Sequence, residues 1–181
     1  NPGVLVTRRA SDLEPMLEAW QAERLPCEQR TMVEVRLDDG QVLSALNEIF
    51  LGHRGHQSAR YRVELGDRAE EHSSSGAIVS TGTGATGWAL SIARERQTRV
   101  ELPAPTERRV AFFVREAWPS PTTGTAIGAG VLDDDAALAL TSRMNEGGVI
   151  FGDGIEGDRI DFAWGRRAEV RVAPRVLRLA R

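Results

Sequence analysis

Hydrophobic and polar residues alternate along most of this chain, which predicts a protein built mainly from β-strands. Residues 32–37 alternate strictly, an Asp-Gly step follows at 39–40, and the apolar pattern returns at 42–46, so a β-hairpin is predicted there. Short apolar or alternating runs at 61–65 and 110–114 predict two further strands. The tail repeats this pattern, with strands predicted at 149–151, 159–164, 169–172 and 176–179.

Helical spacing is confined to two short segments. Apolar residues recur every three or four positions from Leu13 to Trp20, which predicts a helix over 12–24. The Ser-Asp-Leu-Glu sequence at 11–14 matches a capping box, which would satisfy the free N–H groups of the first turn. A second helix is predicted at 88–96. The expected fold is therefore mainly β, an antiparallel sandwich-like domain with one or two short helices.

Composition narrows the classes of protein that fit this pattern. The 181 residues are 41% hydrophobic, enough for one core, and the net charge of -3 gives no general attraction to nucleic acid or to anionic membranes. All 23 basic residues are Arg, and the missing Lys excludes a Walker-type phosphate loop. With one cysteine, Cys27, no bilayer-length apolar run and no signal-peptide pattern, a cytoplasmic protein is expected.

The segment 73–91, SSSGAIVSTGTGATGWALS, carries the strongest functional signal. A short apolar run enters a turn of Ser, Thr and Gly, and the chain leaves it through the start of a helix at Trp88. Such a turn lets the backbone approach a ligand closely, and free N–H groups at the helix start would favour an anion or a polar ligand edge. A glycine-rich turn with no ligand is the other interpretation, and this segment alone leaves both open.

Two polar pairs interrupt apolar strands. Asn47 and Glu48 stand inside the otherwise apolar run 45–51, and partly buried polar groups there need partners, such as ribose hydroxyls. A strand-end bulge with both side chains in solvent is the alternative. Arg115 and Glu116 follow the strand 110–114; they predict either a structural ion pair or an arginine that contacts phosphate.

The remaining polar clusters predict neither a metal site nor a catalytic centre. His53 and His56, with His72, could suggest a metal, but the segment 52–56 has no acidic or Cys ligand at zinc spacing and is expected to be a solvated loop. The acidic stretches 133–135 and 153–158 lack the calcium-loop spacing and are interpreted as turns. No Ser-His-Asp arrangement or acid-base carboxylate pair is evident, so no catalytic residue is predicted in this chain.

Two linked segments resemble the C-terminal domain of NAD kinases. Residues 45–48 read A-L-N-E, and residues 80–88 read S-T-G-T-G-A-T-G-W, where the common bacterial form is S-T-P-T-G-S-T-A-Y. The T-G-T-G form with its Trp, the preceding S-S-G, and the sequence F-V-R-E at 113–116 are closer to the mitochondrial-type branch. The resemblance implies the NAD kinase/diacylglycerol kinase-like fold over residues 1–181.

The resemblance also implies a set of residues that bind NAD. Asn47 and Glu48 resemble the pair that meets the ribose and diphosphate region. Thr86 and Gly87 would form the adenosine pocket together with Trp88, whose indole would lie against the base. The full implied set is Asn47, Glu48, Ser75, Gly82, Thr83, Gly84, Thr86, Gly87, Trp88 and Ser91.

Other positions in this set have more specific implied roles. Ser91 would bind the adenine edge, and the turn 82–84 would give the close backbone approach. Ser75 stands where the family commonly has an Asp that helps to hold the nicotinamide end, so this contact is weakened. Arg115 is a candidate phosphate contact.

The family's N-terminal motif G-G-D-G-T, which carries the catalytic Asp, is absent between Asn1 and Arg181. The resemblance therefore implies a C-terminal domain that is inactive alone, with residues 1–7 as the remnant of a crossover from a missing N-terminal domain. The whole enzyme would convert NAD to NADP with ATP or polyphosphate and a divalent metal such as magnesium, as a homo-oligomer. A related sugar or lipid kinase and a non-enzymatic nucleotide-binding or oligomerisation module are the alternatives.

Overall fold

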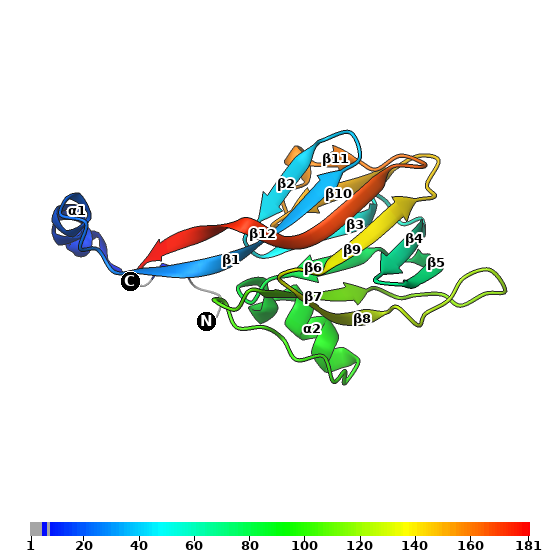
Figure 1. Cartoon of the computed structure of the whole chain (residues 1–181), viewed down its shortest axis with the longest axis horizontal. Helices are drawn as coiled ribbons and strands as arrows, with labels where there is room; N and C mark the ends of the chain where they lie inside the picture. The colour runs from blue at the N-terminus through cyan, green and yellow to red at the C-terminus, as the bar shows by residue number, and fades with distance from the viewer. Residues whose placement is uncertain (1–4, 7) are drawn as a thin grey trace.

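Two six-stranded sheets form the body of the protein (Figure 1). The computed structural model describes residues 5, 6 and 8–181, so most of the crossover remnant expected at 1–7 lies outside the described residues. Sheet A has the order β2-β1-β12-β9-β4-β5, and sheet B has the order β11-β10-β3-β6-β7-β8. Neighbouring strands in both sheets are antiparallel, which confirms the predicted mainly β, sandwich-like class.

The elements have the following bounds. The strands of sheet A are β1 (Cys27–Leu37), β2 (Val42–Ala45), β4 (Ala59–Leu65), β5 (Arg68–Ser74), β9 (Ala137–Ser142) and β12 (Arg167–Ala180). The strands of sheet B are β3 (Glu48–His53), β6 (Ala77–Ser80), β7 (Arg109–Val114), β8 (Ala129–Asp133), β10 (Gly148–Gly152) and β11 (Ile160–Asp161). The helices are α1 (Leu13–Gln21) and α2 (Trp88–Glu95), with 3-10 turns η1 (Ala10–Asp12), η2 (Gly84–Thr86) and η3 (Glu156–Asp158).

The predicted hairpin is present as β1 and β2, but three strand predictions need correction. The two strands predicted at 169–172 and 176–179 are one 14-residue strand, β12. Pro174 lies where the pairing with β1 shifts register, and a bulge is where a strand tolerates proline. The strand predicted at 159–164 is only the two-residue β11.

The α2 prediction is confirmed within one residue, whereas α1 differs from its prediction at both ends. The Ser-Asp-Leu-Glu capping box does not form; instead the Asp12 carboxylate accepts the N–H of Arg9 at 2.9 Å. The helix ends at Gln21 because Glu23 adopts a left-handed backbone conformation, with φ of 56°.

The central strands of sheet B, β3, β6 and β7, are buried on both faces, which explains their continuous apolar sequences. In β3, Ile49 and Leu51 face the main core between the sheets, while Phe50 faces the opposite side. Helix α2 covers that opposite side, packing Ala89 and Ile92 on a smaller core with Phe50. The start of α2 is thereby fixed against the outer face of sheet B.

The first half of β1 and the last half of β12 leave the body as a two-stranded arm that carries α1 at its tip (Figure 1). Leu13, Leu17 and Trp20 recur on one side of α1 and are 59%, 47% and 66% exposed. In the described part of the chain, α1 thus presents an apolar side with nothing packed on it. No described helix combines the length and apolarity that crossing a membrane requires.

Candidate functional site

The Thr-Gly turn between β6 and η2 is closed by its own hydrogen bonds. The hydroxyl Oγ1 of Thr81 accepts the N–H groups of Thr83 at 3.1 Å and Gly84 at 3.3 Å, and the Thr81 carbonyl accepts the N–H of Ala85 at 2.9 Å. The N–H groups of Thr83, Gly84 and Ala85 are therefore paired inside the turn, before the helix start at Trp88 where the sequence predicts free N–H groups. The hydroxyl of Thr81 thus takes up N–H groups that would otherwise be free to bind an anion.

The glycines of this turn allow close packing of the chain on itself. A Cβ on Gly82 would overlap the backbone of Ala104, and a Cβ on Gly84 would overlap the backbone of Asn47. Gly87, in contrast, is exposed, and a Cβ there would meet only ordinary contacts. Gly82 and Gly84 thus bring segments distant in sequence into backbone contact at this end of sheet B.

Arg30 supports the turn from sheet A. This residue of β1 is 9% exposed, and its Nη1 donates to the Thr83 hydroxyl at 3.2 Å. Its Nε lies 2.8 Å from a carboxylate oxygen of Glu28, so the guanidinium is held between the arm and the turn. Nothing in the sequence pattern pointed to this contact, because it joins positions 53 residues apart.

Asp153 holds the segment that contains Asn47 and Glu48. Its carboxylate accepts the backbone N–H groups of Leu46 at 3.0 Å, Asn47 at 2.6 Å and Glu48 at 3.4 Å. The N–H of Asp153 in turn donates to the Glu48 carbonyl at 2.9 Å. The Asn47 carbonyl also accepts the N–H of Thr81 at 2.8 Å, so one network fixes the turn and this segment.

The side chain of Glu48 is half-buried beside this carboxylate. Burial and, secondarily, the negative charge of Asp153 raise the pKa of Glu48 above its usual value. Glu48 pairs with Ser80 in the β3–β6 ladder, so its position along sheet B is fixed. A half-buried carboxyl at a fixed position is suited to hydrogen bonding with a ligand hydroxyl.

An aromatic cavity of about 370 Å³ lies on the outer face of sheet B, next to the start of α2. Phe50 and Phe151 are directly paired across β3 and β10, with ring centroids 4.9 Å apart. The ring of Trp88 stacks on Phe50 at 5.9 Å, with 14° between the planes. Three ring systems from three elements thus line one concave surface.

Arginines surround this cavity. Arg54, Arg115 and Arg159 all line it, together with one carboxylate, Glu156. The guanidinium carbon of Arg115 lies 4.9 Å from the centre of the Trp88 ring, a cation–π contact. Flat apolar faces beside several cations fit a planar ring joined to phosphate groups.

Arg115 also forms the structural ion pair that the sequence predicted as one of its two roles. Its guanidinium lies 3.4 Å from the carboxylate of Glu116, so the structural ion pair is present. The ion pair joins two partly exposed side chains, and such pairs are weak. Arg115 therefore remains available to a ligand in the cavity, and a base that stacks on Trp88 has to displace it from the ring.

Ser75 and Ser91 lie away from the lining of this cavity. Ser75 is exposed before β6, and its N–H donates to the Arg115 carbonyl at 2.9 Å. Ser91 is exposed on α2, one helical turn after Gly87. Thr86 donates its hydroxyl to the Thr83 carbonyl at 3.2 Å and so serves the turn.

The strand register divides the candidate residues between two opposite ends of sheet B. Glu48 pairs with Ser80 at one end, which we call the glycine-turn end and which includes Asn47, the turn 81–84 and Asp153. His53 pairs with Gly148 at the other, which we call the His53 end and which includes Ser75, Arg115 and the loop before β10. The aromatic cavity lies between these ends, so the structure brings Trp88 and Arg115 together but leaves Ser75 far from the turn.

The histidine and acidic clusters form no metal centre. In the residues that the structure describes, no three His, Cys, Asp or Glu side chains gather in a way that could hold a metal ion. His72 lies apart from the other two histidines: its ring is 2% exposed in β5 and stacks on Tyr61 at 5.6 Å. Its Nε2 lies 2.7 Å from Glu70, whose carboxylate also accepts backbone N–H groups of residues 126 and 127.

The fold resembles that of a known kinase. Yeast NADH kinase, solved in complex with NADH, superposes with a TM-score of 0.71 at 16% sequence identity, over 94% of this chain and 49% of the kinase chain. This chain therefore spans about half the length of that kinase. No protein-family model matches the sequence, and no curated protein matches it. The likeness supports the NAD kinase-like fold and does not distinguish the mitochondrial-type branch.

Proposed function

We propose that this chain is the dinucleotide-binding domain of an NAD kinase-like enzyme. The aromatic cavity beside Trp88 carries the proposal, because it joins flat ring faces and three arginines, and one of its rings, Phe50, is two residues along β3 from Glu48. The whole enzyme would transfer a phosphoryl group from ATP or polyphosphate to the 2′-hydroxyl of the NAD adenosine ribose. Catalysis of this transfer rests on positioning and on neutralising charge, and this domain would supply the positioning.

In this proposal each part of the site meets one part of NAD. The adenine ring stacks on Trp88 after Arg115 leaves the ring face, and the arginine then turns to the diphosphate. Asn47 and Glu48, held by Asp153, present side chains to the ribose hydroxyls. The turn 81–84 shapes the backbone around these two residues, and its N–H groups at Thr83 and Gly84 are already bonded to Thr81.

The catalytic base and the divalent metal belong, in this proposal, to a second domain. The described residues do not fit a metal, because no cluster of suitable ligands is present among them. The exposed apolar side of α1 is the surface that such a domain would cover, and about half of the matched kinase lies beyond this likeness. On this basis the chain alone would bind NAD without phosphorylating it, and the complete enzyme would form a homo-oligomer.

Isothermal titration of the chain with NAD tests the proposal. Base stacking on an aromatic side chain contributes about 1–3 kcal/mol, so Trp88→Ala is expected to weaken NAD binding by roughly fivefold or more. Trp118→Ala is the matched control, because that ring is 72% exposed outside the aromatic cavity and its loss should leave the affinity unchanged. Equal NAD affinity in the two variants would contradict the proposal.

The same titration separates the alternatives. A sugar or lipid kinase domain would bind free sugars or lipid head groups and ignore ADP-ribose. A non-enzymatic oligomerisation module would bind none of these compounds, whereas a non-enzymatic nucleotide-binding module would bind NAD and leave the complete protein without kinase activity.

A further inference from the structure

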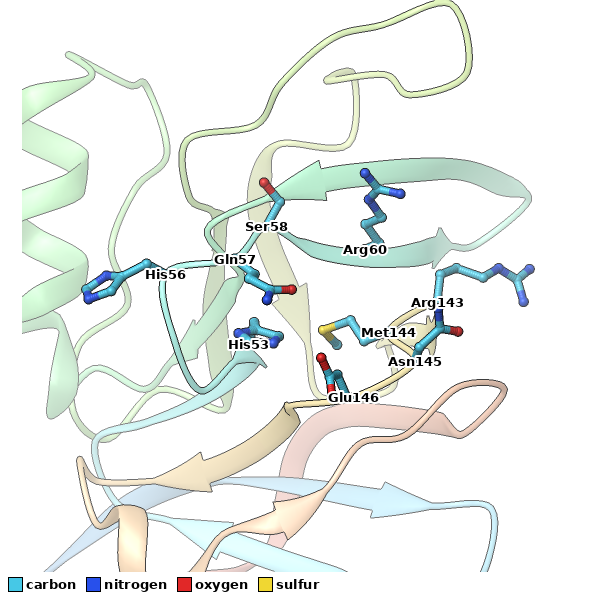
Figure 2. A pocket seen from close by; sticks show the side chains of 9 residues that line it. All are labelled: His53, His56, Gln57, Ser58, Arg60, Arg143, Met144, Asn145 and Glu146. Atoms are coloured by element: carbon cyan, nitrogen blue, oxygen red, sulfur yellow. The ribbon is translucent and has the colours of Figure 1, made fainter.

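A second cavity, of about 570 Å³, opens at the His53 end of sheet B. The loop between β3 and β4 and the loop between β9 and β10 form its walls (Figure 2). His53 lines both this cavity and the aromatic cavity, so the two cavities meet at one side chain. The residues of this second cavity have no role in the proposed function as stated above.

The side chains in the middle of this cavity are not its arginines. Figure 2 shows Gln57, Met144 and Glu146 turned toward the middle beside His53, while the Arg143 guanidinium points away. Arg143 is engaged elsewhere, 3.4 Å from a Glu71 oxygen and over the Trp164 ring at 5.8 Å. The interior therefore offers an amide, a thioether and a carboxylate.

These three groups fit a positively charged flat ring that carries an amide. A carboxylate attracts the positive charge, a thioether packs favourably against an aromatic ring, and a side-chain amide can both donate to and accept from another amide. We infer that this cavity takes the nicotinamide end of the dinucleotide, and that Glu146 makes the site prefer the oxidised, cationic ring over the reduced, neutral one. This inference rests on the proposed function.

The spacing of the two cavities fits the two halves of one ligand. Phe50 and His53 are three residues apart on β3, a separation of roughly 10 Å along the strand. Arg54 follows His53 directly and lines the aromatic cavity, so a cation stands near the place where a diphosphate linker would cross. His53 accepts the N–H of Gly55 at its Nδ1, 3.0 Å away, which leaves Nε2 as the donor of the neutral ring.

A preference for the oxidised form would come from the side chains of this protein, because the fold it shares with yeast NADH kinase does not determine it. Yeast NADH kinase was solved with NADH, although its fold is similar. Charge at position 146 is thus expected to set the redox preference separately from adenosine binding.

Titration of the chain with NAD⁺, NADH and ADP-ribose tests the inference. Because Glu146 is exposed, wild type is expected to bind NAD⁺ roughly 1.5- to fivefold more tightly than NADH, the range for a solvent-exposed charge pair. Glu146→Gln should abolish that preference and leave ADP-ribose affinity unchanged. Asp67→Asn, which removes one charge in the exposed β4–β5 turn, should preserve the preference.

Each other outcome is decisive. Equal binding of NAD⁺ and NADH by wild type, tighter binding of NADH, or a preference that persists in Glu146→Gln overturns the inference while ADP-ribose binding still supports the proposed function. Failure of wild type to bind ADP-ribose and NAD⁺ overturns both.

Discussion

The two ends of sheet B differ in how their polar groups are used. At the glycine-turn end, Thr81 and Asp153 direct their oxygens to backbone N–H groups of the chain itself. At the His53 end, the side chains of Arg54 and Glu146 are exposed around open cavities. The first end is a rigid frame, and the second presents charge to a ligand. We therefore expect substitutions at the glycine-turn end to change stability and those at the His53 end to change specificity.

The largest effect is expected from adding one methyl group at the glycine-turn end. In Gly82→Ala, the new Cβ would overlap the backbone of Ala104, which cannot swing aside as a side chain can. Overpacking typically costs about 1–3 kcal/mol of unfolding free energy and occasionally more, and a clash with backbone is expected at the upper end, measurable by urea denaturation. Gly55→Ala at the His53 end is the control, because its Cβ meets His53 at an ordinary 3.5 Å. Equal losses in the two variants would contradict the distinction between the ends.

A smaller loss of stability is expected when the Asp153 carboxylate is removed. Asp153→Ala leaves three backbone N–H groups without their acceptor, and hydrogen bonds to a charged group contribute about 1.5–3 kcal/mol. NAD affinity should fall as well, because Asn47 and Glu48 lose their fixed backbone. Glu146→Ala at the other end should change unfolding free energy by only about 0.5 kcal/mol. An Asp153→Ala protein with unchanged stability and unchanged NAD affinity would contradict the role of Asp153 in holding the Asn47–Glu48 segment.

The smallest stability effect is a pH dependence at Glu48. Burial and the Asp153 charge raise the pKa of Glu48 above 4.5, so the folded protein holds this proton more tightly than the unfolded chain. Its stabilising contribution is complete below the usual pKa and is lost as pH rises through the raised value. Glu48→Gln cannot ionise, so it should gain stability relative to wild type between about pH 4 and about pH 7. A constant difference in unfolding free energy across that range would contradict the raised pKa.

Most of the fold could be predicted because it follows from local patterns. The Asp-Gly turn at 39–40 and the apolar spacing of α2 are each contained in a few consecutive residues. Strand β5 could not be predicted in this way, because its sequence RAEEHSS is charged and it lies at the edge of sheet A. Strand β9 was missed because alternating Ala and Leu in ALALTS also suits a helix.

The site was predictable only where its residues are close in sequence. Trp88 was identified from its place after the Thr-Gly turn, but Phe151 pairs with Phe50 only through the register of β3 and β10. Asp153 was interpreted as part of a turn, and it does occupy one. Its carboxylate also serves a segment more than 100 residues away, which no sequence spacing reveals.

The two-stranded arm contacts the turn 81–84 and the loop that covers it. Strand β1 begins at Cys27, a short link after α1, and passes through Arg30, whose guanidinium contacts Thr83 in the turn 81–84. The next residue, Thr31, donates its N–H to the carbonyl of Pro105, in the loop that packs over Gly82. The base of the arm therefore contacts both the turn and the loop over it through two neighbouring residues, outside the hydrophobic core. A change in the path of β1 at these residues would shift the frame of the site as well.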